Sequence, residues 1–441
     1  MCWPTRLLLV LLAGCGMQGC ASRLVSDGQL RADVFADVRA RTAEVTGTHP
    51  PEALSHAGIP RSRVEAVLRD SLAREWPEEE IARYQDALVA LGLWPAGRDL
   101  LGWQLATQSE AVVGFYLPER RRFYFVHDDR CGFLGIGCPG DVEIEFVVAH
   151  ELVHAFQHAS HPDLIDFYIR WHDQDDATYA ASAAIEGDAL RRSFEVVSPV
   201  LRLPTPARIA LQYAEPEDAG TADVPALIRL TQTFPYTGGY RLAHAEGRGL
   251  LARPPASTEQ VLHADRRFAD FQAIDLSALA HALPAGCRLL YQNTLGELGL
   301  SILFRDLAAV PLGGLSGGEA PLPARRACGS RACLREVWEG WDGDRYLAAR
   351  CDERRAFLWV TAWDDVEDAR AFEQAYAQLA PAVAARGELG AAPRTSRRER
   401  EVVVWSGRLE PLVRKIDALV RRARVSTLEE LREHFGVSSA P

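Results

Sequence analysis

Two histidines and a glutamate form an HExxH sequence at residues 150–154, with His150, Glu151 and His154 as its polar members. On a helix, residues four positions apart share a face, so the two imidazoles would converge on one point. Two imidazoles, a third protein ligand and a water form the open tetrahedral zinc site of a hydrolase. Glu151 would take the proton of that water. The spacing indicates a catalytic metal site, although about one chain in a hundred of this length would contain the string by chance.

The residues around the HExxH sequence strengthen this interpretation. From Phe146 to Phe156, every residue other than His150, Glu151 and His154 is apolar. Burying two imidazoles and a carboxylate without partners would cost several kcal/mol, and a metal ion is a partner that satisfies all three. A solvated surface helix would have a polar face instead. The apolar surroundings therefore favour a metal site.

Two further histidines follow the sequence but are out of phase with it. A metzincin arrangement would require Gly at position 157 and His at position 160, where this chain has Gln157 and Ser160. His158 and His161 are therefore excluded as the third ligand.

Glu186 is the predicted third ligand. Residues 175–190 have the pattern of a helix that opens with Asp caps and carries small residues over two turns. Small residues let a backbone approach another helix closely, and Glu186, followed by Gly187, would project towards the two histidines. An ordinary surface glutamate is the alternative. Asp188 is a candidate acceptor for a ligand imidazole, although the usual gluzincin pattern places an Asp where this chain has Leu190.

Peptide hydrolysis at such a site also requires a hydrogen-bond donor for the developing oxyanion. Tyr236, Tyr240 and His263 are the candidates. Each also has a structural interpretation, because buried tyrosines and histidines usually satisfy their neighbours. The sequence leaves the choice among them open.

The hydrophobic pattern predicts the elements that position these residues. Residues 51–107 have a helical pattern, and residues 111–126 form two strands around a proline-containing turn. The edge strand of such a pair could hydrogen-bond an extended peptide across the metal. Residues 346–351 and 356–363 are predicted to form a second hairpin, followed by an Asp-capped helix over 364–379. The predicted fold class is α+β, with a zincin-like core of helices, a small sheet, the HExxH helix and a Glu-bearing helix, followed by a mixed α/β C-terminal region.

The N-terminus has the features of an export signal. Arg6 precedes the apolar run 7–13, which is too short to span a bilayer and long enough for a signal-peptide core. The sequence LAGC ending at Cys15 has the form of a bacterial lipobox and predicts a lipid on Cys15, with Cys20 as the weaker alternative. Cleavage and release without a lipid is the other possibility. The residue after Cys15 is Gly16 and not the Asp that commonly retains lipoproteins at an inner membrane. We therefore expect the protein in the cell envelope, anchored to the outer membrane.

Cysteine usage agrees with an exported protein. Apart from Cys2 and the two lipidation candidates, the chain has six cysteines, namely Cys131, Cys138, Cys287, Cys328, Cys333 and Cys351. An even number in an exported chain predicts disulfide bonds. Cys131 and Cys138 bracket a glycine-rich loop before the HExxH helix and are the predicted pair. No CxxC spacing supports a cysteine metal site.

Composition and length bound the remaining possibilities. With 48% hydrophobic residues and a net charge of -11, the chain can bury a large core and lacks the basic stripe of a nucleic-acid-binding protein. A chain of 441 residues is expected to form one large or two medium domains. We predict a lipoprotein signal peptide at 1–14, a tether at 15–50, a zincin-like metallopeptidase domain at 51–308 and a C-terminal α/β region at 309–441.

Over most of residues 60 to 380, the chain resembles a largely uncharacterised family of secreted or lipid-anchored prokaryotic zincin-like metallopeptidases. The resemblance rests on Ala90–Leu93, Gly114–Tyr116, the HELVHAFQ segment at 150–157, Ile185–Ala189, Phe234–Tyr236, Pro254–His263, Gly296–Glu297 and Gly340–Tyr346. The chain departs from the family at Tyr116-Leu117-Pro118, where the family has Tyr-Asp-Pro, and it is shortened between residues 241 and 253. The resemblance implies a gluzincin-like zinc peptidase and names no substrate.

The function predicted from these features is zinc-dependent peptide-bond hydrolysis in the cell envelope by a lipid-anchored metallopeptidase. In this prediction His150, His154 and Glu186 hold Zn²⁺, and Glu151 is the general base. The alternative is a catalytically silent metal-binding envelope lipoprotein that acts as a binding or structural module. The presence of Glu151 counts against that alternative. A metal-dependent hydrolase of a non-peptide amide is a third possibility.

Overall fold

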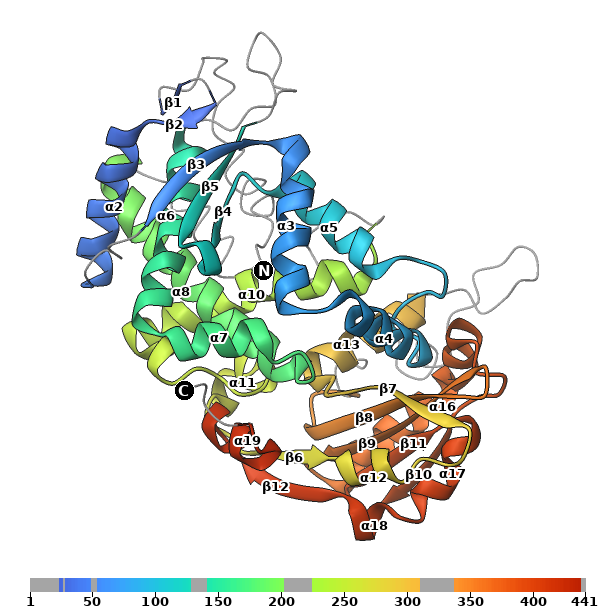
Figure 1. Ribbon diagram of the computed structural model, residues 1–441. Coiled ribbons are helices and arrows are strands. Elements are labelled where there is room, and N and C mark those ends of the chain that lie inside the picture. The colour runs from blue at the N-terminus through green and yellow to red at the C-terminus, as the bar shows by residue number, and fades with distance from the viewer. Residues whose placement is uncertain are drawn as a thin grey trace. The chain divides into compact units, whose positions relative to one another are not determined.

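A computed structural model of the protein describes residues 24–26, 28–48, 54–127, 141–201, 224–309 and 337–437 (Figure 1). The chain divides into two compact units. Unit 1 comprises Met1–Pro77, Leu101–Arg170 and Ala181–Pro254, and unit 2 comprises Glu78–Leu100, Trp171–Ala180 and Pro255–Pro441. Helices and strands occur in both units, so the predicted α+β class holds for the described chain.

The unit boundaries differ from the predicted domain boundary. Two short segments of the first half of the chain, Glu78–Leu100 and Trp171–Ala180, belong to unit 2, and the last boundary lies between Pro254 and Pro255. The predicted division between residues 308 and 309 coincides with none of these positions. Hydrophobic periodicity describes an element locally, whereas the unit that an element joins depends on contacts far along the chain.

Unit 1 contains a three-stranded sheet with the order β3-β5-β4. β4 (Gly114–Leu117) and β5 (Arg122–His127) are antiparallel, and the short helix η1 (Pro118–Arg120) connects them. Arg121 ends this turn in a left-handed conformation, with φ 47°. The predicted strand pair around a proline-containing turn is therefore confirmed, and β4 is an edge strand.

The third strand of this sheet corrects the helical prediction for residues 51–107. β3 (Ser55–Pro60) pairs in parallel with β5, from Ser55 opposite Arg122 to Pro60 opposite His127. The sequence SHAGIP shows no alternation of apolar and polar residues. Its strand conformation is therefore set by pairing with a distant strand, which local patterns do not reveal.

The predicted tether at 15–50 also needs a correction. Residues Ala32–Thr46 form helix α2, and Phe35, Val38 and Thr42 are buried on one face of it. Phe35 and Val38 belong to the same hydrophobic core as the HExxH helix. The buried residues Phe35, Val38 and Thr42 are three and four positions apart, which is the spacing of an amphipathic helix that packs on a core. This segment is therefore part of the fold.

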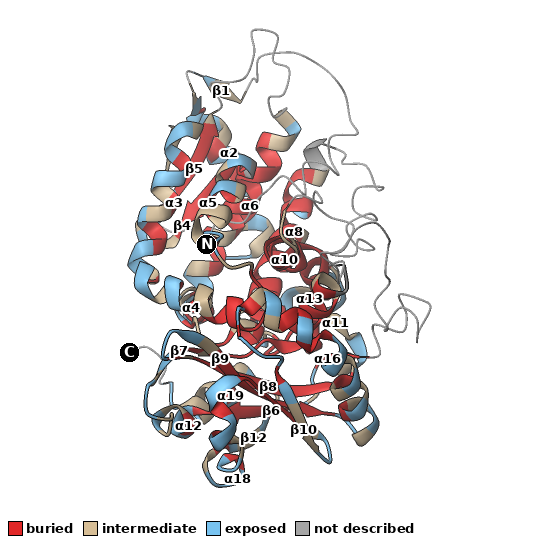
Figure 2. Ribbon diagram, turned by 90° about the vertical axis from the view of Figure 1, so that its right-hand side faces the viewer, coloured by how far each residue is buried: buried red, intermediate tan, exposed pale blue. Residues whose placement is uncertain are grey.

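Three helices build the part of unit 1 that contains the HExxH sequence and Glu186. They are α6 (Asp141–Ser160), α8 (Asp175–Leu201, in unit 1 from Ala181 onward) and α10 (Ala226–Glu246). The HExxH sequence lies in the second half of α6, and Glu186 lies on α8, within the predicted helix. Figure 2 shows that α10 is buried over most of its length.

Helices α8 and α10 approach each other backbone to backbone. A Cβ atom at Gly187 would lie 2.0 Å from the carbonyl oxygen of Gly239, and a Cβ atom at Gly239 would lie 2.1 Å from the carbonyl oxygen of Ala183. Only glycine leaves room for such a contact. This close approach confirms the expectation that the small residues around Glu186 let its helix pack tightly against another.

Unit 1 also contains two short strands and four further helices in its described residues. They are β1 (Val25–Ser26), β2 (Gln29–Leu30), α3 (Arg61–Glu75), α5 (Leu100–Ala111), α7 (Pro162–Arg170) and η3 (Gly247–Ala252).

Unit 2 is built on a five-stranded antiparallel sheet with the order β10-β11-β9-β8-β7. Its strands are β7 (Cys287–Asn293), β8 (Trp341–Cys351), β9 (Arg354–Trp363), β10 (Arg394–Arg398) and β11 (Glu401–Trp405). β8 and β9 form the predicted second hairpin. Both strands are buried along most of their length (Figure 2), so they form the centre of the sheet.

An Asp-capped helix follows this hairpin, as predicted, but it begins at Val366, two residues after the predicted start. Asp365 caps α16 (Val366–Gly387), because its carboxylate accepts hydrogen bonds from the backbone N–H groups of Glu367 and Asp368. Such a cap satisfies N–H groups that have no partner within the helix. The helix continues beyond the predicted end at residue 379.

The remaining elements of unit 2 are short, apart from two helices. They are α4 (Glu78–Ala90), α11 (Glu259–Leu262), η4 (Ala264–Arg266), β6 (Phe271–Asp275), α12 (Ser277–His281), α13 (Gly296–Ala309), η5 (Gly407–Leu409), α17 (Glu410–Val413), α18 (Ile416–Leu419), β12 (Arg421–Val425) and α19 (Leu428–Phe435). β6 and β12 form a separate antiparallel pair.

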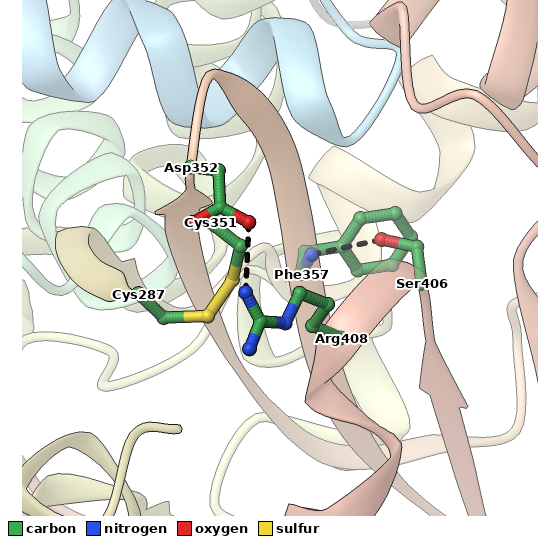
Figure 3. The surroundings of a disulfide bond; sticks show 6 residues. All are labelled: Cys287, Cys351, Asp352, Phe357, Ser406 and Arg408. Carbon is green, nitrogen blue, oxygen red and sulfur yellow. Dashed lines mark hydrogen bonds and ion pairs between the residues drawn. A yellow bond between two sulfur atoms is a disulfide. The ribbon is translucent and has the colours of Figure 1, made fainter. Parts of the chain in front are cut away.

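A disulfide bond links Cys287 on β7 to Cys351 on β8, which lie opposite each other in the sheet (Figure 3). The next residue, Asp352, forms an ion pair with Arg408, with 2.7 Å between its Oδ2 and the guanidinium Nη1. This disulfide agrees with the expectation of cross-linked cysteines.

The predicted pair Cys131 and Cys138 lies outside the described residues. The same holds for the lipidation candidates Cys15 and Cys20, so their modification stays a prediction. Within the part of the chain that the structure describes, no helix has the length and apolar character needed to cross a bilayer.

Candidate metal centre

The side chains of His150, His154 and Glu186 converge between α6 and α8. Nε2 of His150 lies 3.1 Å from Oε2 of Glu186, and Nε2 of His154 lies 3.4 Å from the same oxygen. The two Nε2 atoms are 3.1 Å apart. One ligand atom from each residue lies within 4.8 Å of the others, so this group could hold a metal ion. No other group of this kind occurs among the described residues.

The chemistry of these atoms fits a cation. A carboxylate oxygen only accepts hydrogen bonds, and a neutral imidazole accepts at one of its nitrogens. His150 is 2% exposed and Glu186 is 5% exposed, so water cannot supply the missing donors freely. Three acceptors that face one another in a buried site require protons or a metal ion between them. Two imidazoles and a carboxylate are a common ligand set for divalent metals.

In the absence of a metal, protons take its place. Burial alone would lower the pKa of His154, but Glu186 raises that pKa to about 9. Burial would raise the pKa of Glu186, but the charge of His154 and hydrogen bonds from both imidazoles bring it well below its usual range. Burial also lowers the pKa of His150. The metal-free site is therefore a His154–Glu186 ion pair, and metal binding has to displace a proton from His154.

Glu151 lies beside this group and is anchored to the edge strand of the sheet. Its Oε2 accepts a hydrogen bond from the backbone N–H of Tyr116 on β4, at 2.8 Å. The N–H of Val126 donates to the carbonyl oxygen of Val113, so Val113 and Val126 form a hydrogen-bonded pair. Along two antiparallel strands, such pairs alternate with pairs that share no hydrogen bond. The N–H and C=O groups of Tyr116 therefore point away from β5. Burial raises the pKa of Glu151 to about 8, so this group can exchange a proton near neutral pH.

A cleft opens next to these residues within unit 1. It has a volume of about 510 Å³, part of it open to solvent, and Glu151, His154 and Glu186 line it. Much of the remaining wall is apolar, with Ile165 and Ile169 from α7 among the lining residues. The three candidate ligands therefore border a space that is partly open to solvent.

The structure separates the three candidates for the oxyanion donor. Tyr236 lines the cleft, and its ring centroid lies 6.2 Å from that of His150. Tyr240 does not line the cleft and packs against Phe194, with 5.8 Å between ring centroids. His263 belongs to unit 2, where its Nε2 lies 2.8 Å from Oε1 of Glu297. Only Tyr236 of these three borders the cleft.

The two histidines that the sequence excluded, His158 and His161, are not part of the group formed by His150, His154 and Glu186. His158 lines the cleft, and its Nδ1 lies 3.1 Å from the hydroxyl oxygen of Tyr116. His161 is not among the residues that line the cleft. Neither belongs to the group of three side chains that could hold a metal.

Asp188 does not contact a ligand imidazole, which corrects the role predicted for it. Its Oδ2 accepts from Nε2 of Gln157 at 3.1 Å, and Arg192 also donates to it. The residue that contacts a ligand is Gln157, whose Oε1 lies 2.8 Å from Nδ1 of His154. Sequence reasoning used Gln157 only to exclude a metzincin. Its position three residues after His154 on one helix face could have indicated this contact.

Comparisons with known proteins concern unit 2. The chain matches a family described as "Domain of unknown function (DUF8575)" over residues 288–419. No curated protein and no solved structure matches the chain. The matched region contains none of the residues of the candidate metal centre, so the interpretation of that centre rests on its own chemistry.

Proposed function

We propose that this protein is a zinc-dependent metallopeptidase that hydrolyses peptide bonds. The observation that carries the proposal is the convergence of His150, His154 and Glu186 at a cleft that Glu151 also lines. A donor set of two histidines and one glutamate with one open position is that of a catalytic zinc site. When bound, zinc would polarise the scissile carbonyl and acidify a water.

Each residue of the site would have its own role in the reaction. His150, His154 and Glu186 hold the ion. Glu151 accepts the proton of the attacking water and passes it to the leaving amine. Tyr236, at the wall of the cleft, is our candidate donor to the developing oxyanion.

The edge strand β4 supports a peptide as the substrate. Its Tyr116 directs backbone groups away from the sheet, and the N–H group already contacts Glu151. The carbonyl oxygen of Tyr116 points the same way and can accept a hydrogen bond from an extended peptide. The apolar wall with Ile165 and Ile169 offers contacts for a side chain of that peptide.

The arrangement of elements in unit 1 supports a zincin-like core. An antiparallel edge strand lies next to the HExxH helix α6, and the glutamate ligand comes from a second helix, α8. We therefore propose the zincin-like class for this unit. We also keep the proposal that a lipid on Cys15, or on Cys20, anchors the protein in the cell envelope at the outer membrane, where its substrates would be peptides or proteins.

A metal assay combined with a turnover assay tests the proposed function. The purified protein should contain about one zinc per chain and should cleave a denatured protein such as casein. We expect Glu151→Gln to lower kcat/KM by about 10²–10⁴-fold with unchanged zinc content, because it removes the general base. Glu143→Gln, an identical change on the same helix α6 but away from the cleft, should retain both activity and zinc.

Other outcomes separate the alternatives. Bound zinc without turnover by the wild type or by Glu151→Gln would favour the catalytically silent binding module. Turnover of small amides but not of peptides would favour a non-peptide hydrolase. A wild-type protein that binds no metal would refute the proposal.

A further inference from the structure

Gln157 contacts both helices that carry the metal group. Its Oε1 lies 2.8 Å from Nδ1 of His154, one turn earlier on α6. Its Nε2 donates to the carbonyl oxygen of Ile185 at 2.9 Å and to Oδ2 of Asp188 at 3.1 Å. Ile185 and Asp188 lie on either side of Glu186 on α8. One buried amide therefore links a ligand on α6 to the segment that carries the ligand on α8.

The neighbours of the amide nitrogen determine how the amide is oriented. A carbonyl oxygen and a carboxylate accept hydrogen bonds and donate none. The Asp188 carboxylate is itself held by Arg192, whose Nε lies 2.8 Å and 2.7 Å from its two oxygens. The NH₂ group of Gln157 has to face these acceptors. Its Oε1 therefore faces His154 and accepts a hydrogen bond from Nδ1–H.

We propose that Gln157 is a positioning residue that keeps a proton on Nδ1 of His154 and so makes Nε2 the metal-binding atom. The geometry agrees, because Nε2 is the nitrogen of His154 that lies 3.4 Å from Glu186 Oε2. A partner on the second ring nitrogen of a histidine ligand commonly fixes its tautomer and ring orientation. The inference rests on the metal of the proposed function and is independent of peptide hydrolysis.

The two histidines differ in this respect. Nδ1 of His150 is buried and has no hydrogen-bond partner among the described residues. The His150 ring has aromatic neighbours instead, with ring centroids 6.5 Å from Phe146 and 6.2 Å from Tyr236. His154 is the ligand whose orientation depends on a hydrogen bond, so a change at Gln157 should act on metal binding through His154.

Replacement of Gln157 by alanine tests this role. Gln157→Ala removes the acceptor for His154, and we expect the dissociation constant for Zn²⁺, measured by competition with a chromogenic chelator, to rise about 10–100-fold. Gln108→Ala is the matched control. Gln108 is another buried glutamine of unit 1, with 4% exposure against 3% for Gln157, and it borders neither the metal group nor the cleft. This control should leave the dissociation constant unchanged.

Thermal unfolding with and without Zn²⁺ separates positioning from general stability. A purely structural role would lower the melting temperatures of the metal-free and zinc-bound proteins equally. A positioning role reduces the rise in melting temperature at a fixed Zn²⁺ concentration, because that rise depends on the dissociation constant. We expect the smaller rise for Gln157→Ala and the full rise for Gln108→Ala.

A second variant keeps the size of the side chain. Gln157→Met is close to glutamine in volume, but it lacks the amide oxygen that accepts from His154. We expect its dissociation constant for Zn²⁺ to rise as in Gln157→Ala, and it decides the matter if Gln157→Ala does not fold. Wild-type Zn²⁺ affinity in a folded Gln157→Ala or Gln157→Met variant would overturn the inference. A wild-type protein without Zn²⁺ affinity would refute the proposed function as well.

Discussion

Glu186 in unit 1 and Asp344 in unit 2 are both buried carboxylates, with 5% and 2% exposure, but their neighbours differ in kind. Each oxygen of Asp344 accepts two hydrogen bonds. The donors are the backbone N–H groups of Leu295 and Gly296 and the indole N–H groups of Trp341 and Trp359, at 2.8 to 3.0 Å. Glu186 instead faces imidazole nitrogens, which can accept as well as donate.

This difference distinguishes a structural carboxylate from a candidate ligand. Four donors from the chain satisfy Asp344, so its burial needs no further partner. The acceptors around Glu186 leave room for a cation. Burial of an acidic residue is therefore weak information about function until the polarity of its neighbours is known.

Replacing each carboxylate by its isosteric amide should have different effects on the free energy of unfolding at Asp344 and at Glu186. In Asp344→Asn, the new NH₂ group would face two N–H donors, so we expect a loss of about 2–4 kcal/mol in the free energy of unfolding. In metal-free Glu186→Gln, the ion pair with His154 is lost, but His154 can release its proton and the new NH₂ group can donate to an imidazole nitrogen, so we expect a smaller loss of about 1–2 kcal/mol. Urea-induced unfolding followed by tryptophan fluorescence measures both. Equal losses would contradict the distinction.

Zinc should stabilise the protein through the Glu186 group alone. At a free Zn²⁺ concentration 100 times the dissociation constant, we expect about 2.7 kcal/mol of stabilisation. Glu186→Gln should abolish it, and His158→Ala should retain it, since His158 is outside the ligand group. The pKa of about 9 for His154 means that protons compete with the metal, so the stabilisation at fixed total zinc should be smaller at pH 6 than at pH 8. Equal zinc stabilisation of Glu186→Gln would show that another site binds the ion.

The glycine contact that positions Glu186 should tolerate no side chain. Gly239→Ala would force α8 and α10 apart, since its Cβ atom would lie 2.1 Å from the carbonyl oxygen of Ala183. We expect a loss of about 1–3 kcal/mol in the free energy of unfolding, together with weaker zinc binding. Gly249→Ala is the control in the same unit, because its Cβ atom would have no neighbour within 4 Å. Loss of stability without loss of zinc affinity would show that the helix contact does not set the ligand geometry.

Asp176 in unit 2 represents a third kind of buried carboxylate, which keeps its own proton. Burial raises its pKa to about 8, although the backbone N–H and the hydroxyl of Thr258 donate to it. In the unfolded chain the pKa is about 4. Between these values the folded state binds more protons, so the free energy of unfolding falls as the pH rises from 4 to 8.

The variant Asp176→Asn removes this titration and keeps an acceptor for Thr258. We expect its free energy of unfolding, relative to that of the wild type, to rise by about 3–4 kcal/mol from pH 5 to pH 8. Urea unfolding at both pH values measures the gain. A constant difference across this range would mean that Asp176 is ionised in the folded protein.

The sequence by itself determined the features that depend on spacing along one element. The i, i+4 spacing of His150 and His154 places them on a common face of any helix. It also places Glu151, the residue after His150, beside that face. The same holds for the hairpin of β8 and β9 and for an Asp cap at the start of α16, because turn residues and caps act over a few positions. These patterns are local, so they can be read without knowing what lies opposite.

Only the tertiary structure decided which partners meet across the chain. The contact of Gly187 with Gly239 sets the distance between helices, and Gln157 rather than Asp188 reaches His154. β3 is a strand because β5 lies beside it, and α2 is a helix of the core instead of a tether. Long-range packing sets these distances and the polarity around each buried group. A sequence pattern specifies which face a residue occupies, but not which atoms lie opposite that face.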